Sequence, residues 1–248
     1  MGFSLKHFET LDLQALSQRT AWIKRNDSKF LAPIAALDEL LACFAPDYLL
    51  LENNGSRMAV YHTEYLDTVD YNMYFEHQRD RAHRFKIRRR RYGNESQFWL
   101  EVKEKMPDGK TVKHRLFNPS SDEEAGFVQK HTPYRWDELL PSLQVKYERI
   151  TLLHKSLPLK VTLDSKLTAF DSNKTVHFNE LLIVEFKSEN KECNRVEKLM
   201  KPMRLKPCSL SKYCIAMATL HPELKQNAFK PTLLQIKKVT DYGNPEPV

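Results

Sequence analysis

A regular alternation of basic and apolar residues constrains the fold of this chain more than any other feature. Residues 84–92 read R-F-K-I-R-R-R-R-Y. Side chains alternate across a β-strand, so every second residue of this stretch shares one face. One face holds Arg84, Lys86, Arg88 and Arg90, and the other begins with Phe85 and Ile87. The pattern predicts a β-strand with one strongly basic side.

The same alternation recurs in the two segments that follow, residues 97–106 and 111–117. In the first, an apolar face of Phe98, Leu100 and Val102 opposes a polar face of Trp99, Glu101, Lys103 and Lys105. In the second, Lys113 and Arg115 lie on the polar face. The link Pro107-Asp108-Gly109-Lys110 is typical of a hairpin turn, because proline fixes φ and glycine accepts a positive φ. We therefore expect these segments to be antiparallel neighbours.

The rest of the chain supplies more short strands and a few helices. Strands are predicted at residues 57–66, 144–152, 160–169 and 176–187, and helices at residues 30–44, 68–80, 121–130, 191–200 and 209–220. This mixture indicates an α+β fold built on one large antiparallel sheet or barrel with flanking helices. We expect an N-terminal helical segment over residues 1–18, a main domain over 19–224 and a loosely ordered tail over 225–248, which contains three prolines.

Basic residues concentrate on the polar faces of the predicted strands. These faces carry eleven bases: Arg84, Lys86, Arg88, Arg90, Lys103, Lys105, Lys113, Arg115, Arg149, Lys160 and Lys187. They carry four acids: Glu101, Asp164, Glu185 and Glu189. The resulting excess of seven positive charges equals the net charge of the whole chain, +7.

This excess favours a polyanionic ligand over a merely solvated sheet. A solvated face normally interleaves both signs, because like charges opposite each other destabilise a sheet. Arginine binds phosphate oxygens in pairs, and lysine adds a compact charge. Nucleic acid usually requires aromatic residues among the bases, and only Trp99 and Tyr147 lie on these faces. We therefore expect a phosphate-rich ligand and no nucleic acid.

The sequence lacks the motifs that several classes of protein require. Only six glycines occur, and neither a dinucleotide-binding G-x-G-x-x-G nor a P-loop motif is present. The four cysteines show no C-x-x-C spacing, so neither a zinc site nor a disulfide framework is indicated. No apolar run is long enough for a membrane span, and we expect a cytoplasmic protein.

Seven short motifs follow one another along the chain. They are Arg25-Asn26-Asp27-Ser28-Lys29, Tyr65-Leu66-Asp67-Thr68, the segment 84–92, Leu100-Glu101-Val102-Lys103-Glu104-Lys105, Val161-Thr162-Leu163-Asp164, Val184-Glu185-Phe186-Lys187 and Ser211-Lys212-Tyr213. In this order they resemble the VTC domain, the polyphosphate polymerase domain of the triphosphate tunnel metalloenzyme superfamily. The resemblance runs from about Arg19 to Leu220.

The resemblance implies an antiparallel barrel whose basic interior forms a triphosphate tunnel. Relatives transfer the terminal phosphate of ATP onto a growing polyphosphate chain with the help of a divalent metal. Together with the basic faces, it predicts catalytic contacts at Arg88, Arg90, Lys103, Arg149, Lys160 and Lys212. Further phosphate contacts are predicted at Lys29, Lys86, Lys105, Lys113, Arg115, Lys187 and Ser211. Tyr147 would lie near the nucleotide, and Glu185 would hold Mn²⁺ or Mg²⁺.

These roles agree with the chemistry of phosphoryl transfer, which depends on positioning and on neutralising the phosphate oxygens. The expected ligands are ATP, inorganic triphosphate or polyphosphate. A membrane-protein partner is left open, as is the oligomeric state. Some of these residues also have a purely structural interpretation: Glu101 could only neutralise its basic neighbours, and Ser211 could only cap a helix.

Two alternatives to a polymerase remain. Tunnel triphosphatases tend to carry E-x-E-x-K motifs whose glutamates hold two metals, whereas residues 100–105 here read L-E-V-K-E-K, which favours a polymerase. A binding module without catalysis is the third hypothesis. It is supported by Ser209, which stands where polymerases of this family often place a lysine.

Overall fold

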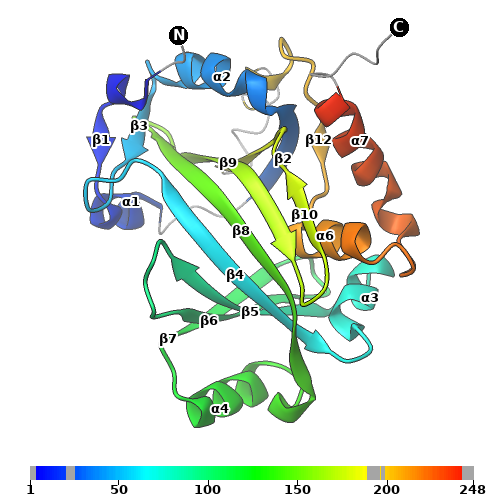
Figure 1. Ribbon diagram of the computed structural model, residues 1–248. Helices are drawn as coiled ribbons and strands as arrows, with labels where there is room; N and C mark the ends of the chain where they lie inside the picture. The colour runs from blue at the N-terminus through cyan, green and yellow to red at the C-terminus, as the bar shows by residue number, and fades with distance from the viewer. Residues whose placement is uncertain (1–3, 21–25, 189–195, 197–198, 242–248) are drawn as a thin grey trace, which may run out of the picture.

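Figure 1 shows the computed structural model of the chain, which describes residues 4–20, 26–188, 196 and 199–241. The strands are β1 (Thr10–Leu11), β2 (Asn26–Pro33), β3 (Tyr48–Leu51), β4 (Ala59–Thr68), β5 (Arg84–Tyr92), β6 (Trp99–Lys105), β7 (Thr111–Phe117), β8 (Leu139–His154), β9 (Leu159–Phe170), β10 (Thr175–Phe178), β11 (Leu181–Ser188) and β12 (Pro207–Cys208). The α-helices are α1 (Leu13–Thr20), α2 (Leu37–Phe44), α3 (Asn72–Gln78), α4 (Ser121–His131), α6 (Lys212–Leu220) and α7 (Lys230–Asp241).

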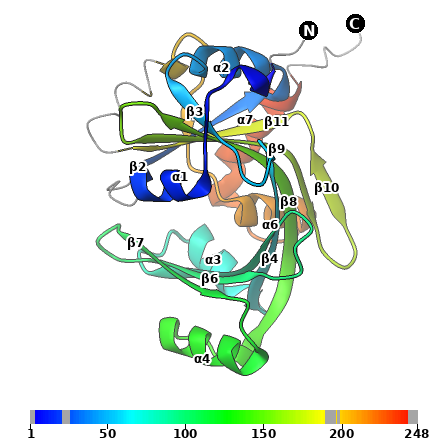
Figure 2. The ribbon, with the colours of Figure 1, turned by 90° about the vertical axis from the view of Figure 1, so that its left-hand side faces the viewer.

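All twelve strands of the described residues belong to one sheet. Its main path runs β12-β2-β11-β9-β8-β4-β5-β6-β7, and every pairing along this path is antiparallel. Figure 2 shows the sheet bent back on itself, so that β6 and β7 lie opposite β2 and β9. The long strands β4 and β8 form the bend. The expected α+β fold on a large antiparallel sheet is therefore confirmed.

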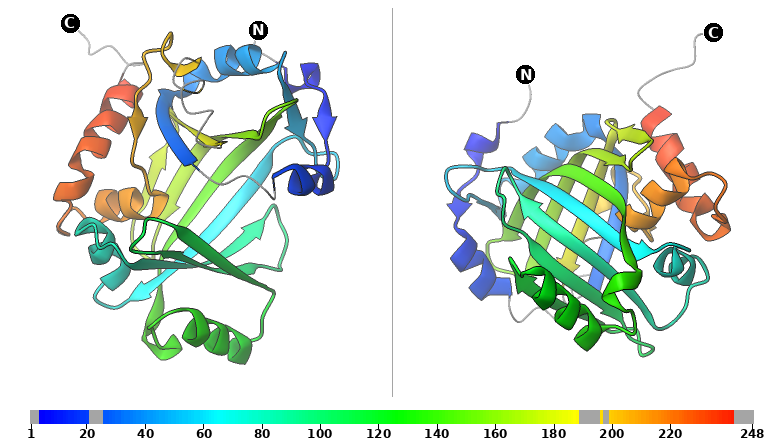
Figure 3. Two further views of the ribbon diagram at one scale, coloured as in Figure 1. Left: turned by 180° about the vertical axis from the view of Figure 1, so that it is seen from behind. Right: turned by 60° about the horizontal axis from the view of Figure 1, so that its bottom comes forward.

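Two helices cover the outer side of the bent sheet, at opposite sides of the molecule (Figure 3). Under α2, the residues Phe30, Val184 and Phe186 join a core with Leu40 and Phe44. Under α4, a second core contains Ile87, Leu100, Val102 and Val128. These two halves of the bent sheet, which we call its arms, bury the named apolar residues on the outer side. The residues that alternate with them along each strand therefore face inward, as the period of two predicts.

Helix α6 fills one end of the inner side. Its residues Tyr213 and Met217 pack in one core with Tyr65, Val145 and Ile183, which come from three different strands of the sheet. This helix was predicted at residues 209–220 and begins at Lys212, because the side chain of Ser211 caps it. The apolar end under α6 leaves the remainder of the inner side to charged residues.

Two predicted elements differ in the structure, and a third falls mostly outside the residues that the structure describes. Residues 30–33 belong to strand β2, so the predicted helix over residues 30–44 is wrong in its first part, and α2 begins only at Leu37. Residues 176–187 form two strands, β10 and β11, rather than one. The helix predicted at residues 191–200 lies mostly outside the described residues.

The prediction of a loosely ordered tail over residues 225–248 is wrong for its first half. Residues 230–241 form helix α7, which packs against β2 and buries Thr232 and Ile236. Pro231 is compatible with a helix because it lies in the first turn, where no backbone hydrogen bond is lost. Among the described helices, none is long and apolar enough to cross a membrane.

Candidate functional site

Strands β5, β6 and β7 place their basic residues in rows across the inner side of the sheet. Arg88 lies opposite Glu101, which lies opposite Arg115. The next row joins Lys86, Lys103 and Lys113, and Lys105 follows opposite Arg84. We call this inward side of the whole sheet the charged face; its bases are Lys29, Lys86, Arg88, Arg90, Lys103, Lys105, Lys113, Arg115, Arg149, Lys160 and Lys187.

One carboxylate of the first row, that of Glu101, forms ion pairs with four bases of the charged face. The Glu101 side chain, which is 1% exposed, lies 2.7 Å from Arg88, 3.6 Å from Arg90 and 3.2 Å from Arg115, and it also pairs with Lys113. Burial alone would raise the pKa of Glu101, but the neighbouring cations hold it well below its usual range. The group is therefore ionised, and a single negative charge faces four positive ones.

Two lysines of the second row hold their charge weakly. Burial lowers the pKa of Lys86 to about 8, and its ammonium donates a hydrogen bond of 2.9 Å to Ser211. Burial, opposed by the attraction of Glu101, lowers the pKa of Lys113 to about 7. For both ammonium groups burial outweighs the attraction of the surrounding negative charges, so additional negative charge nearby would raise the pKa of each.

The other arm of the sheet contributes a second set of charges. Glu185 of β11 lies opposite Lys29 of β2, and Lys187 lies opposite Lys160. The Glu185 carboxylate is 3.9 Å from the Lys29 ammonium and 3.7 Å from that of Lys187. Although burial works against ionisation, these lysines lower the pKa of Glu185 to about 2. Glu185 is thus an ionised carboxylate whose two ion pairs are long.

The two sets converge across the space between the arms. Desolvation by the surrounding atoms and the charge of Lys29 lower the pKa of Lys103 of β6 to about 8, while Asp27 opposes this effect. Lys29 and Asp27 belong to β2, which is separated from β6 by five intervening strands of the sheet path. Lys103 and Lys29, which come from separate strands, are therefore close enough to influence each other electrostatically, and the phosphate contacts expected at both residues stay predictions.

Helix α6 directs its first residues at the charged face. The Lys212 ammonium lies 2.5 Å from Asp164, and Arg149 binds the same carboxylate through two nitrogens at 2.5 and 2.7 Å. Ser211 caps the helix and also accepts the hydrogen bond from Lys86. The helix cap that the sequence allowed for Ser211 is therefore present, and its contact with phosphate stays a prediction.

Tyr147 does not offer a free ring for a nucleotide base. It is 2% exposed and stacks on Tyr61 with ring centroids 4.9 Å apart. The Lys212 ammonium lies 4.6 Å from its centroid, and the Arg149 guanidinium 5.3 Å. Its role is to support these two cations. Tyr61 was missed in the sequence analysis, although alternation along the strand predicted at residues 57–66 places it on the same side as Tyr65.

A divalent metal would find few free ligands on the charged face. No three His, Cys, Asp or Glu side chains form a metal-binding group among the described residues. Glu101 and Asp164 are both bound by cations at short distance. Glu185, with its longer ion pairs, is the carboxylate that fits one metal ion, provided that phosphate oxygens complete the coordination.

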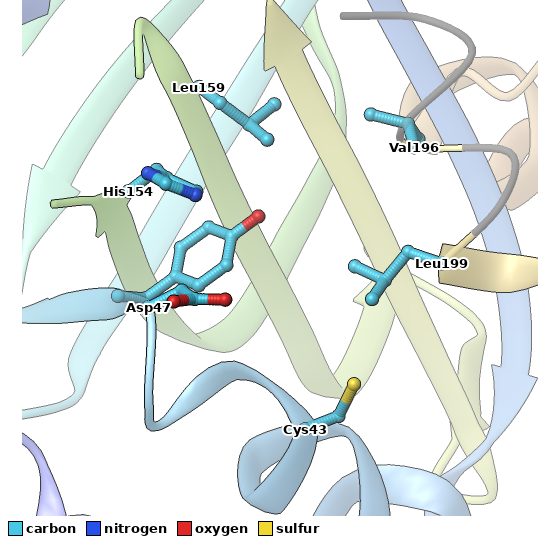
Figure 4. Close-up of a pocket in the computed structure, with 7 residues that line it drawn as sticks. Cys43, Asp47, His154, Leu159, Val196 and Leu199 are labelled. Carbon is cyan, nitrogen blue, oxygen red and sulfur yellow. The ribbon is translucent and has the colours of Figure 1, made fainter. Parts of the chain in front are cut away.

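Two pockets lie away from the charged face. Figure 4 shows a small one of about 50 Å³, lined by Cys43, His154 and Leu159 among others. The Nδ1 atom of His154 accepts hydrogen bonds from the backbone N–H groups of Ser156 and Leu157, which indicates a structural role. A wider pocket of about 380 Å³ lies near Val69 and Leu140. Neither contains a residue predicted for the site.

The model of the VTC domain matches residues 24–133 and 118–221, which is well over half of the chain. This chain belongs to the VTC domain family. A search of the curated proteins finds no match. Among solved structures, an adenylyl cyclase candidate from Hippeastrum with a dominant triphosphatase activity is 14% identical, with a TM-score of 0.52 over 79% of this chain and 96% of that one.

A second solved structure, an adenylate cyclase candidate from Bacillus halodurans, is 12% identical, with a TM-score of 0.48 over 75% of this chain and 93% of that one. At such low identity, the likeness to the Hippeastrum protein shows the fold alone. This VTC domain therefore has the triphosphate tunnel fold.

Proposed function

We propose that this VTC domain is a phosphotransferase that uses ATP and a divalent metal to extend polyphosphate. The observation that carries the proposal is the balance of charges on the charged face. Of its three buried carboxylates, Glu101 faces four cations and Asp164 faces two. The third, Glu185, makes longer ion pairs with Lys29 and Lys187. The bases of the charged face outnumber these carboxylates, so the face suits a long polyanion.

Different residues of the charged face would have different roles in phosphoryl transfer. The rows that contain Arg88 and Lys113 would bind the triphosphate and neutralise the charge on its oxygens. Lys212, held by Asp164 at the start of α6, would meet the phosphate on the opposite side. When bound, a metal held by Glu185 would polarise a phosphoryl oxygen.

A tunnel triphosphatase is the second candidate, supported by the fold shared with the Hippeastrum protein. Hydrolysis by two metals requires several carboxylates that are free to bind them. Among the described carboxylates of the charged face that are buried, Glu185 alone is not held by a cation within 3.5 Å. This observation favours the phosphotransferase.

The test is incubation of the purified chain with ATP and Mn²⁺ or Mg²⁺, followed by separation of the products by length and by a phosphate assay. Chains longer than the triphosphate support the proposal. Free phosphate without chains supports the triphosphatase. Binding of triphosphate with neither product identifies a binding module and contradicts both enzymatic functions.

A further inference from the structure

An aromatic pair lies in the row of the charged face that also contains Arg90. Trp99 of β6 lies opposite Phe117 of β7, and their ring centroids are 4.8 Å apart. Because side chains alternate, Trp99 shares the face of Glu101 and Phe117 that of Arg115. The pair therefore lies two residues along the strands from the row of Arg88, Glu101 and Arg115.

This pair does not contribute to a hydrophobic core. Neither ring belongs to any of the four apolar clusters of the described residues, and Phe117 is 48% exposed. Partly exposed rings that lie among bases offer a π-face to a ligand. The pair therefore differs from Tyr147, whose ring is buried.

Arg115 connects the pair to the phosphate-binding rows. Its guanidinium lies 5.2 Å from the centroid of the Trp99 ring and 3.2 Å from Glu101. Along a strand, two residues span about 6.8 Å, so the aromatic pair is about 7 Å from the first cationic row and about 14 Å from the second. Rings followed by two cationic rows match a ligand with a planar base at one end and phosphates at the other.

We propose that Trp99 and Phe117 form the nucleobase subsite of this domain, so that the domain takes nucleoside triphosphates with the base stacked on the pair. The inference rests on the proposed function, because it assumes that the triphosphate lies along the cationic rows. Stacking accepts every base, since each has a π-face. ATP and GTP would therefore both use the subsite, whereas inorganic triphosphate would not.

The experiment compares ATP and inorganic triphosphate binding by calorimetry without metal, in the full chain and in the double variant Trp99→Leu, Phe117→Leu. We expect the dissociation constant for ATP to rise about 5- to 150-fold, which is the loss of about 1–3 kcal/mol from one stacked base. The constant for inorganic triphosphate should stay within twofold. The single variant Trp99→Phe should restore most of the ATP affinity, and Trp136→Leu, on the outer side, is the matched control.

Two results would overturn the subsite and leave the proposed function intact. One is unchanged ATP binding in the double variant. The other is an equal loss for both ligands, which would show that the pair only stabilises the hairpin. If the unmodified chain binds neither ligand, the proposed function itself fails. A single-stranded oligonucleotide that binds more tightly than ATP, and loses its affinity in the double variant, would assign the pair to nucleic acid and overturn the inference.

Discussion

The hydroxyl of Tyr213 donates a hydrogen bond of 2.5 Å to the carboxylate of Asp67. Asp67 is fully buried at the end of β4 and also accepts hydrogen bonds from the backbone N–H groups of Thr68, Met73 and Tyr74 at the start of α3. Tyr213 stacks on Tyr65 as well, with centroids 4.9 Å apart. This contact fixes the helix that presents Ser211 and Lys212 to the charged face.

Replacing Tyr213 with phenylalanine tests this anchoring. We expect Tyr213→Phe to lower the free energy of unfolding by about 1–3 kcal/mol, because a buried carboxylate loses one of its donors. Triphosphate affinity should also fall, since Lys212 is displaced with the helix. Chemical denaturation and calorimetry measure the two effects. Tyr92→Phe, whose hydroxyl makes no hydrogen bond recorded among the described residues, is the control, and an equal loss there would contradict the anchoring.

Arg90 and Arg91 are adjacent in sequence but lie on opposite sides of β5, and this makes them a matched pair. The Arg90 side chain is 9% exposed, lies on the charged face and contacts Tyr61, whereas Arg91 is exposed on the outer side. We expect Arg90→Ala to raise the dissociation constant for triphosphate about 10- to 150-fold, since a charge-assisted hydrogen bond contributes about 1.5–3 kcal/mol. Arg91→Ala should change it less than threefold. Equal effects would place the binding site elsewhere.

Glu101→Gln removes the negative charge that four cations share. We expect the ligand-free protein to lose about 3 kcal/mol of stability, because breaking a buried ion pair leaves uncompensated charges. Saturating inorganic triphosphate should recover much of this loss, since its phosphates supply the missing negative charge. Thermal unfolding with and without triphosphate measures the recovery. A variant that binds triphosphate less tightly than the original chain would show that Glu101 does more than neutralise.

The charged face could be predicted from the sequence because apolar and charged residues alternate along any strand that has one apolar and one charged side. Strand β5 was predicted with its observed bounds, residues 84–92. Strand β2 was misassigned in its second half because Phe30, Leu31 and Ala32 are all buried, so both sides of the strand are apolar. A continuous apolar run cannot be distinguished from part of a helix by periodicity alone.

Contacts between residues that are far apart in the chain could not be predicted from the sequence. The sharing of Asp164 by Arg149 and Lys212, and the covering of the Tyr147 ring by Tyr61, depend on which strands become neighbours after folding. Alternation gives the side of a strand but not its partner. The role of Tyr147 was therefore expected from the resemblance, and its burial emerged only from the packing.

The lowered pKa values of Lys86 and Lys113 lead us to expect that the protein takes up protons when it binds triphosphate. Their pKa values, about 8 and about 7 without ligand, lie below the ordinary value of 10.5, and nearby phosphate would raise them. Affinity should therefore fall as the pH rises from 7 to 9. The stability of the ligand-free protein should rise over the same range, because the unfolded chain binds more protons there.

Calorimetry in two buffers of different ionisation enthalpy measures the proton uptake. The variant Lys86→Gln, Lys113→Gln is the reference, because it keeps the ionisation of the triphosphate itself but lacks both lysines. We expect its proton uptake to be smaller by up to two protons per bound triphosphate. Equal uptake in both proteins would show that neither ammonium group contacts the phosphates.

The variant Glu185→Gln distinguishes the contribution of the metal to triphosphate binding from that of the bases. Glu185 is ionised, and its carboxylate lies 3.9 and 3.7 Å from two ammonium groups, so it retains oxygen lone pairs for a metal ion. Without metal, the variant should bind inorganic triphosphate at least as tightly as the original chain, because a negative charge has been removed from the charged face. The increase in affinity that Mn²⁺ produces in the original chain should be lost. Glu148→Gln, whose carboxylate pairs with Lys166 on the outer side, controls for the loss of a glutamate. An undiminished Mn²⁺ effect in Glu185→Gln would remove Glu185 from the metal site and leave the cationic rows as the explanation of binding.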